Sequence, residues 1–288
     1  MDPDLQAAYL ARLGLEPEPP SVDALQRLHR AQVARVPYET LWIHTGEGWD
    51  IDLDRSVQRV ALEGRGGYCF HLNGAFSALL ESLGYEVERH VGGVHAPGGP
   101  EGFEMTNHLV LTVLGLPTDD HPDGTWYVDA GLGDALYEAV PLRASDFEQG
   151  PFRLSIEATP GGVGDWHLTH DRLGGFAGMA WRAAPTTMSA FEERHEWLST
   201  SPDSGFVRVA TAQRRDADGV DIVRGLVLTR VQDGEAIAGP DLTERDDWFA
   251  VLAEVFGLRF DHLTADARDA LWARTLTEYR RWVDAGRP

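Results

Sequence analysis

The chain has little cysteine and no lysine. Cys69 is the only cysteine in 288 residues, so no intramolecular disulfide can form, and such usage is typical of a reducing compartment. All 25 basic residues are arginines, against 46 aspartates and glutamates, which gives a net charge of −21. This excess of negative charge argues against nucleic acid and anionic membranes as partners, and an anionic ligand would need arginines gathered locally.

Long apolar runs are also missing. No stretch approaches the roughly 18 apolar residues that a membrane-spanning helix needs. The first residues, Met1 to Asp4, lack the basic and apolar segments of a signal peptide. We therefore expect a cytoplasmic protein with no membrane partner, and the chain length favours two or three packed subdomains over one small core.

The single cysteine lies at the start of a predicted helix. Residues 65–73 read RGGYCFHLN, and the two glycines before Tyr68 permit a tight backbone path. After Cys69, apolar residues recur with helical spacing as far as Gly84, namely Leu72, Phe76, Leu79, Leu80 and Leu83. The free N–H groups and the positive dipole end of such a helix stabilise a thiolate. The pattern therefore favours a nucleophile over an inert core cysteine.

A nucleophilic thiol needs a base and an acid that orients the base, close in space although distant in sequence. His108 opens a strand-like run at 106–113, and Asp129 closes another at 125–129, before a glycine turn. If these strands are neighbours, both side chains reach one sheet edge that faces Cys69. His108 would then take the thiol proton, and Asp129 would fix its tautomer. Each residue alone has an ordinary structural explanation, so only the combination indicates catalysis.

These segments resemble the arylamine N-acetyltransferases. The likeness rests on six motifs in order between residues 20 and 260: VPYETL at 36–41, RGGYCF at 65–70 with Asn73, NHLV at 107–110, YVDAGLG at 127–133, STSPDSGF at 199–206 and EVFGL at 254–258. Two positions depart from the family pattern, since His71 replaces the usual glutamate and Leu132 the usual phenylalanine. His71 is either a structural substitute or a residue that alters the thiolate or the choice of substrate.

The resemblance implies a ping-pong acyl transfer. Cys69 would attack the thioester of acetyl-CoA, a donor substrate and not a permanently bound cofactor, and an arylamine, arylhydroxylamine or hydrazine would then take the acetyl group. Backbone N–H groups around Cys69 would bind the oxyanion. By the same analogy, Gly131 and Gly133 would pass close to the pantetheine and phosphates of the donor, which glycine permits. No metal is implied.

Several side chains are candidates for support of this site. Tyr38 and Phe70 flank the motifs and could stack on a flat aromatic amine, with Leu132 as a further pocket residue; ordinary core packing is the alternative for the two rings. Arg65 could form a buried ion pair with Glu39 that holds the glycine loop, or it could be a solvated surface arginine. His167 and His170 have a spacing that permits metal binding, but no further ligand follows nearby.

The predicted fold class is α+β, with a cysteine-protease-like Cys–His–Asp arrangement. Residues 1–84 are expected to form a helical bundle that carries the nucleophile, with Ser21 as one N-cap. Residues 85–190 would form an antiparallel β-barrel that carries the histidine and aspartate, and residues 191–288 an α/β lid. We expect strands at 85–91, 108–113, 125–128, 152–156, 205–213 and 222–230, helices at 246–256 and 266–282, and a long loop at 95–102.

Two other enzymatic functions fit the same residues. One is an amide synthase of natural-product biosynthesis, which moves a longer acyl chain from a carrier-protein thioester. The other is a hydrolase, because peptidases and amidases also use Cys–His–Asp. A binding module without catalysis is a fourth possibility. The sequence does not determine the oligomeric state.

Overall fold

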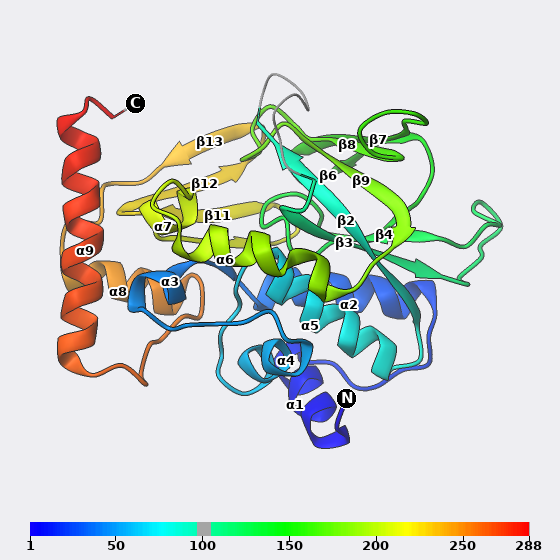
Figure 1. Ribbon diagram of the computed structural model, residues 1–288, viewed down its shortest axis with the longest axis horizontal. Coiled ribbons are helices and arrows are strands. Elements are labelled where there is room, and N and C mark those ends of the chain that lie inside the picture. The colour runs from blue at the N-terminus through cyan, green and yellow to red at the C-terminus, as the bar shows by residue number, and fades with distance from the viewer. Residues whose placement is uncertain (97–104, 288) are drawn as a thin grey trace.

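The fold is known from a computed structural model, which describes residues 1–96 and 105–287. Most of the loop expected at 95–102 falls outside the described residues. Helices cover one side of an eight-stranded sheet, and a second sheet with two helices forms the other end of the molecule (Figure 1). No helix in the described part of the chain is both long and apolar enough to cross a membrane. The predicted α+β class is confirmed.

The N-terminal segment contains five helices. They are α1 (Pro3–Leu13), α2 (Val22–Arg35), the short α3 (Leu41–Thr45), α4 (Leu53–Ala61) and α5 (Cys69–Ser82). Side chains that accept a backbone N–H cap three of them, as expected for Asp and Ser at this position. Asp2 caps α1, Asp52 caps α4, and the predicted N-cap Ser21 accepts from the N–H of Ala24 at 3.2 Å.

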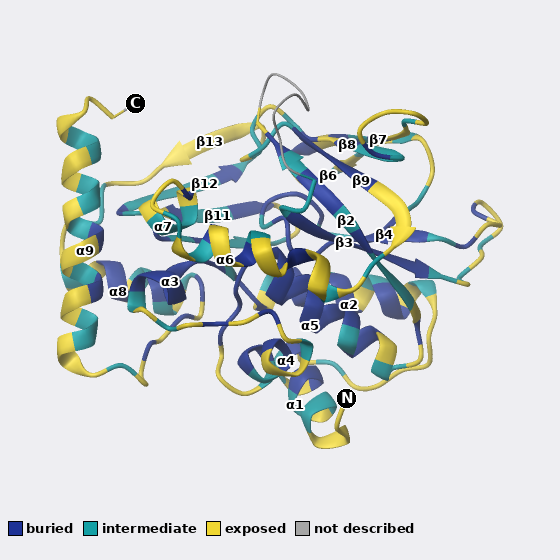
Figure 2. Cartoon of the chain, viewed as in Figure 1, coloured by how far each residue is buried: buried dark blue, intermediate teal, exposed yellow. Residues whose placement is uncertain are grey.

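Helix α5 is a core helix. Eleven of its 14 residues are buried, so very little of its surface faces solvent. Figure 2 shows the helix in dark blue along most of its length. It contacts β2 (Glu86–His95) and β3 (His108–Leu114) on one side and α1 and α4 on the other. The thiol at its first residue is therefore held on a rigid element.

The central sheet is antiparallel, and its strands have the order β5-β4-β3-β2-β9-β8-β7-β6. The bounds are β2 (Glu86–His95), β3 (His108–Leu114), β4 (Trp126–Val128), β5 (Val140–Pro141), β6 (Ser145–Gln149), β7 (Phe152–Ala158), β8 (Trp166–Thr169) and β9 (Gly178–Pro185). The sheet is curled but ends at β5 and β6, so the expected barrel is a half-barrel. In its register, Leu111 of β3 pairs with Val128 of β4. His108 and Asp129 therefore lie at the same end of two neighbouring strands.

The C-terminal segment builds a five-stranded sheet of order β1-β10-β11-β12-β13. Its first strand, β1 (Tyr38–Glu39), comes from the helical segment and pairs with β10 (Thr211–Arg215), so the two ends of the chain share one sheet. The other strands are β11 (Gly219–Arg224), β12 (Val227–Gln232) and β13 (Glu235–Ala238). Before this sheet come a 3₁₀ turn (Met188–Phe191), α6 (Glu192–Thr200) and α7 (Gly205–Arg208), and after it α8 (Arg245–Glu254) and α9 (Ala265–Asp284).

Two strand predictions in this segment were wrong. The strand expected at 205–213 begins as helix α7, because Ser204 accepts the N–H of Phe206 and caps a helical turn. The strand expected at 222–230 is a hairpin, since Gly225 turns the chain with φ of 60° between β11 and β12. The two helices expected near the C-terminus are confirmed as α8 and α9.

Candidate active site

Cys69 is the first residue of α5, as the sequence predicts. Its Sγ lies 3.6 Å from the carbonyl oxygen of Asn107, and the side chain is 4% exposed. The preceding glycines have no room for a side chain. A Cβ on Gly66 would lie 1.8 Å from the carbonyl oxygen of Pro37, and Gly67 has φ of 116° with the ring of His71 against it. The loop therefore brings the thiol to the helix N-terminus along a path that only glycine can take.

The structure brings His108 and Asp129 together beside the cysteine. His108 Nε2 and Asp129 Oδ2 are 2.8 Å apart, and His108 and Cys69 line the same pocket. Burial lowers the pKa of His108, but interactions with Asp129 and Cys69 outweigh this effect and raise the pKa to about 10. The ring is therefore an imidazolium at neutral pH.

The carboxylate of Asp129 is fully hydrogen-bonded although it is 1% exposed. Oδ2 accepts from Tyr127 Oη at 3.0 Å in addition to His108, and Oδ1 accepts from Asn73 Nδ2 at 2.8 Å and from the N–H of Gly131 at 2.9 Å. Four donors account for the lone pairs of a carboxylate that water cannot reach. Its orientation toward His108 is thereby fixed.

Asn73 connects α5 to β3 and to the turn after β4. It lies one turn after Cys69 on α5, and its Nδ2 also donates to the carbonyl of Leu109 at 2.7 Å. Its Oδ1 accepts the N–H of Ala130 at 2.9 Å. Next to it, a Cβ on Gly131 would lie 2.7 Å from the Cα of Cys69. This turn therefore has a glycine because the cysteine backbone packs directly on it.

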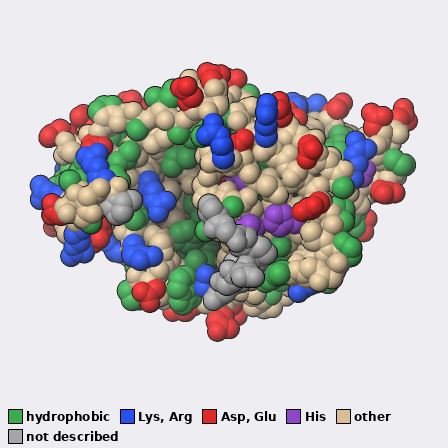
Figure 3. All heavy atoms as spheres, turned by 90° about the horizontal axis from the view of Figure 1, so that it is seen from above, with side chains coloured by type: hydrophobic (Ala, Val, Ile, Leu, Met, Phe, Trp, Pro, Cys, Tyr) green, Lys and Arg blue, Asp and Glu red, His purple; other side chains and the backbone are tan. Residues whose placement is uncertain are grey.

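A pocket of about 310 Å³ opens over the cysteine. Of the residues predicted for substrate and cofactor contacts, Tyr38, Leu132 and Gly131 line it. Gly133 lies beneath the wall of this pocket, where a Cβ would meet the side chains of Gln213 and Tyr38. In Figure 3 the surface is hollowed, with hydrophobic side chains at the base of the hollow and arginines around it.

Phe70 lies outside this pocket. It is fully buried and packs against Phe191 and Tyr68, with ring centroids 5.0 and 5.5 Å away. Of the two explanations that the sequence offered for this ring, its position agrees with core packing. The ring anchors α5 against the segment that precedes α6.

His71 is also turned away from the thiol. Its Nε2 lies 3.1 Å from the carbonyl oxygen of Asp50, and its ring packs among Trp42, Trp49, Tyr68 and His195. Burial, with the nearby His195 and Arg59, lowers the pKa of His71 well below its ordinary value, so the ring is neutral. These contacts agree with the structural explanation of this departure from the family pattern.

Arg65 and Glu39 lie in contact inside the protein. Arg65 Nη2 is 2.9 Å from Glu39 Oε1, with side-chain exposures of 3% and 0%, and Nη1 is 3.1 Å from Glu47. The guanidinium also lies between the rings of Trp49 and Phe260, 4.7 and 4.8 Å from their centroids. One forked cation thus joins β1, the glycine loop and the C-terminal segment.

The C-terminal segment adds Phe206, Gln213 and Arg224 to the pocket, from α7, β10 and β11. Phe206 belongs to the motif at 199–206, whereas Gln213 and Arg224 belong to none of the six motifs. Gln213 lies beside Tyr38 because β10 pairs with β1, a contact between residues more than 170 positions apart in the chain. No local pattern could have indicated that contact.

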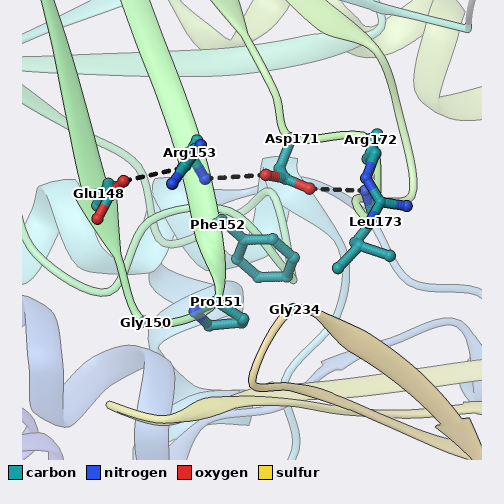
Figure 4. Close-up of a pocket in the computed structure, with 9 residues that line it drawn as sticks. All are labelled: Glu148, Gly150, Pro151, Phe152, Arg153, Asp171, Arg172, Leu173 and Gly234. Carbon is teal, nitrogen blue, oxygen red and sulfur yellow. Dashed lines mark hydrogen bonds and ion pairs between the residues drawn. The ribbon is translucent and has the colours of Figure 1, made fainter.

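A second hollow, of about 600 Å³, lies at the β6–β7 hairpin (Figure 4). Its polar groups largely bind one another: Arg153 pairs with Glu148 at 2.9 Å, and Asp171 accepts the N–H groups of Arg153 and Leu173. No thiol or imidazole is among its lining residues. It is therefore a weaker candidate for chemistry than the pocket of Cys69.

The two histidines with metal-compatible spacing point to different places. His167 Nε2 is 3.0 Å from that of His95, whereas His170 packs between Phe152 and Phe176. Within residues 1–96 and 105–287, no three His, Cys, Asp or Glu side chains are grouped to hold a metal.

The raised pKa of His108 predicts a pH-dependent stability. The folded protein holds the ring proton up to about pH 10 and the unfolded chain only up to about 6.5. The contribution is therefore complete below about pH 6.5 and is lost as the pH rises through 10. We expect the difference in unfolding free energy between wild type and His108→Gln, from urea denaturation, to shrink between about pH 6 and pH 9. A constant difference would contradict the assignment.

Arg65→Lys should destabilise the protein by about 1–3 kcal/mol, because one ammonium cannot replace the fork that spans Glu39 and Glu47. Thermal unfolding of this variant measures the loss. The matched control is Arg280→Lys on the exposed face of α9, which should leave the melting temperature unchanged. If both variants melt with the wild type, the buried ion pair has no structural importance.

Comparison with known proteins finds relatives over most of the chain. A family model described as N-acetyltransferase matches residues 21–265. The arylamine N-acetyltransferase / N-hydroxyarylamine O-acetyltransferase of Salmonella typhimurium is 26% identical over 288 residues, which cover 97% of this chain and 98% of that protein. Arylamine N-acetyltransferase 1 of Homo sapiens is 28% identical over 248 residues, 77% of this chain and 81% of that protein.

Solved structures of the same family share the fold. The Nocardia farcinica arylamine N-acetyltransferase superposes with a TM-score of 0.80 at 29% identity, over 94% of this chain and 95% of that one. A Mycobacterium marinum enzyme solved in complex with CoA superposes with a TM-score of 0.81 at 23% identity, over 94% and 98%, which shows the fold alone. Since the family model spans most of the sequence, the chain is an enzyme that belongs to the arylamine N-acetyltransferase family.

Proposed function

We propose that this enzyme moves an acetyl group from acetyl-CoA to an arylamine by way of a thioester on Cys69. The observation that carries the proposal is that the thiol of Cys69 and the imidazole of His108 line one pocket, with the imidazole bound to the buried carboxylate of Asp129. The family supports the reaction class, and a structural neighbour binds CoA. Hydrazines and arylhydroxylamines belong to the same proposal as further acceptors, since each offers a weakly basic nitrogen or oxygen nucleophile.

The first half-reaction loads the enzyme. The thiolate of Cys69 attacks the carbonyl carbon of the thioester, and the negative charge moves to the oxygen. N–H groups at the start of α5, which have no intrahelical partners, would stabilise that oxygen. When the intermediate collapses, the bond to the CoA sulfur breaks and the leaving thiolate takes the proton of His108. The products are acetyl-Cys69, neutral His108 and free CoA.

The second half-reaction discharges the enzyme. The amine attacks the acetyl carbonyl, the bond to the sulfur of Cys69 breaks, and neutral His108 accepts the amine proton. This restores the ion pair of thiolate and imidazolium. Asp129 orients the ring of His108 in both states and stabilises its imidazolium form without giving up its own charge. Tyr38, Leu132 and Phe206 would provide the apolar walls for a flat acceptor.

The donor needs a positively charged path in a protein of net charge −21. A groove of about 630 Å³ over β11 and β12 shares Gly175 and Arg224 with the cysteine pocket, so the two are neighbours. Arg208 and Arg224 line the groove and are exposed. We assign the phosphates of the donor to these guanidinium groups, which bind phosphate well. In this proposal the role of Gly131 and Gly133 is to let the turn at 131–133 pack closely against Cys69, Tyr38 and Gln213.

Intact-mass measurement after incubation with acetyl-CoA tests the mechanism. Wild type should gain one acetyl group and release one CoA, and an arylamine should discharge it. Cys69→Ala should gain none. Asp129→Asn should load at least about a hundredfold more slowly, since the imidazolium loses its counter-charge. Continued CoA release without amine, beyond one CoA per enzyme, would instead indicate a hydrolase. An adduct formed only from longer acyl thioesters would indicate an amide synthase.

Arg224→Gln should raise the KM for acetyl-CoA about threefold to tenfold with little change in kcat, because a phosphate contact of about 1 kcal/mol is lost. The effect should weaken as salt screens the interaction. Steady-state kinetics at low and high ionic strength measure both effects. Arg259→Gln, an exposed arginine outside both pockets, is the control. An unchanged KM in the Arg224 variant would remove this groove as the donor path.

A further inference from the structure

His29 is a buried histidine behind the catalytic carboxylate. It belongs to α2 and is fully buried. Its Nε2 lies 3.3 Å from the backbone nitrogen of Asp129, which donates to it, and its Nδ1 lies 3.0 Å from the carbonyl oxygen of Tyr137. The ring edge packs on Phe76, with centroids 6.0 Å apart. One imidazole thus touches both ends of the segment from 129 to 137.

The two partners fix the protonation of this ring. A backbone N–H can only donate and a carbonyl can only accept, so Nε2 carries the lone pair and Nδ1 carries the proton. A second proton would place N–H against N–H of Asp129. Burial lowers the pKa of His29, which agrees with a neutral ring. His29 is therefore a fixed connector and not a proton carrier.

The N–H of Asp129 needs a partner such as His29 Nε2, because β4 ends one residue earlier and no neighbouring strand in the described part of the chain accepts this N–H. The ladder between β3 and β4 stops at the pair Leu111 and Val128, one residue before Asp129. Beyond it, the chain enters the turn that packs on Cys69 through Gly131 and lines the pocket through Leu132. At the far end, the N–H groups of Tyr137 and Glu138 bind Gln149 Oε1 at 2.6 and 3.0 Å.

Two other side chains of α2 bind only residues that follow directly after this segment. Gln26 Nε2 donates to the carbonyl of Ala139 at 2.7 Å, and Arg30 Nε donates to Glu138 at 2.8 Å. Of the three, His29 alone also reaches Asp129. Helix α2 therefore carries side chains that bind only beyond the turn, Gln26 and Arg30, and one that also binds Asp129, His29.

We infer that His29 is a positioning residue for the reaction: its Nε2 holds the backbone of Asp129 so that the carboxylate meets His108 and Gly131 lies against Cys69. The inference rests on the proposed function for its catalytic meaning. Its effect on the thiol is measurable without acetyl transfer, because Cys69 is the only cysteine and any alkylation reports on it alone. Small displacements at such a site reduce rates strongly.

Two isosteric variants separate the two contacts of the ring. The amide of His29→Gln can place its oxygen where Nε2 lies and accept the N–H of Asp129, but it loses Tyr137. The amide of His29→Asn can donate to Tyr137 but is too short to reach Asp129. Gln26→Met is the control, because it removes the contact of α2 with Ala139 and leaves the contact with Asp129 in place.

The measurement is the rate of Cys69 alkylation by iodoacetamide across about pH 5 to 9, with thermal unfolding of each variant. We expect His29→Gln and Gln26→Met to stay within about threefold of wild type, and His29→Asn to react about tenfold more slowly near pH 6, with its profile displaced to higher pH. The rate of acetyl loading from acetyl-CoA should follow the same order.

Equal rates for the Gln and Asn variants would overturn the inference, as would losses that follow the melting temperatures of all variants, Gln26→Met included. If wild type alkylates as expected but never takes an acetyl group from acetyl-CoA, the proposed function fails and the positioning of Asp129 by His29 stands. If wild type loads normally and no His29 variant alters alkylation, the inference alone fails.

Discussion

The structure depends on the buried carboxylate of Asp129. Removing a carboxylate from water costs several kcal/mol unless hydrogen bonds and a counter-charge replace its hydration. Asp129 receives four donors, from Asn73 on α5, His108 on β3, Tyr127 on β4 and Gly131 on the following turn. The charge is therefore tolerated only when these elements have met. The contacts that complete the core at this point are the same contacts that orient the imidazolium toward the sulfur.

Much of this site was predictable, because the residues next to Cys69, His108 and Asp129 in the sequence determine the local structure there. The glycines before Cys69 and the apolar spacing after it gave the helix and its first residue, and strand patterns gave the positions of His108 and Asp129. The part of the pocket wall that β10 contributes was not predictable, since Gln213 reaches it through strand pairing over a long separation. Strand runs near the C-terminus were misjudged where a cap at Ser204 and a glycine turn decided the backbone more strongly than apolar content did.

Charge works differently at the two scales of this protein. The net charge of −21 repels anions at a distance, yet salt at physiological strength screens such a field within about 8 Å. At short range, a few guanidinium groups on a concave surface decide whether a phosphate binds. Arg208 and Arg224, which line the groove beside the cysteine pocket, would satisfy that condition without altering the sign of the net charge. An acidic composition is therefore compatible with an anionic donor, provided that a few arginines lie at the positions where the phosphates bind.

The ion pair of Arg65 and Glu39 links the geometry of the thiol to the formation of the pocket. Glu39 lies on β1, next to Tyr38, and β1 is the strand that binds the C-terminal sheet to the helical segment. Arg65 begins the glycine loop, and its guanidinium also lies on Phe260. Apolar side chains could fill the same volume, but they would not fix direction, whereas a forked cation between two carboxylates does. The register of β1 on β10, the path of the loop and the placement of Cys69 are thereby settled together, so the pocket forms only around a thiol that is already in position.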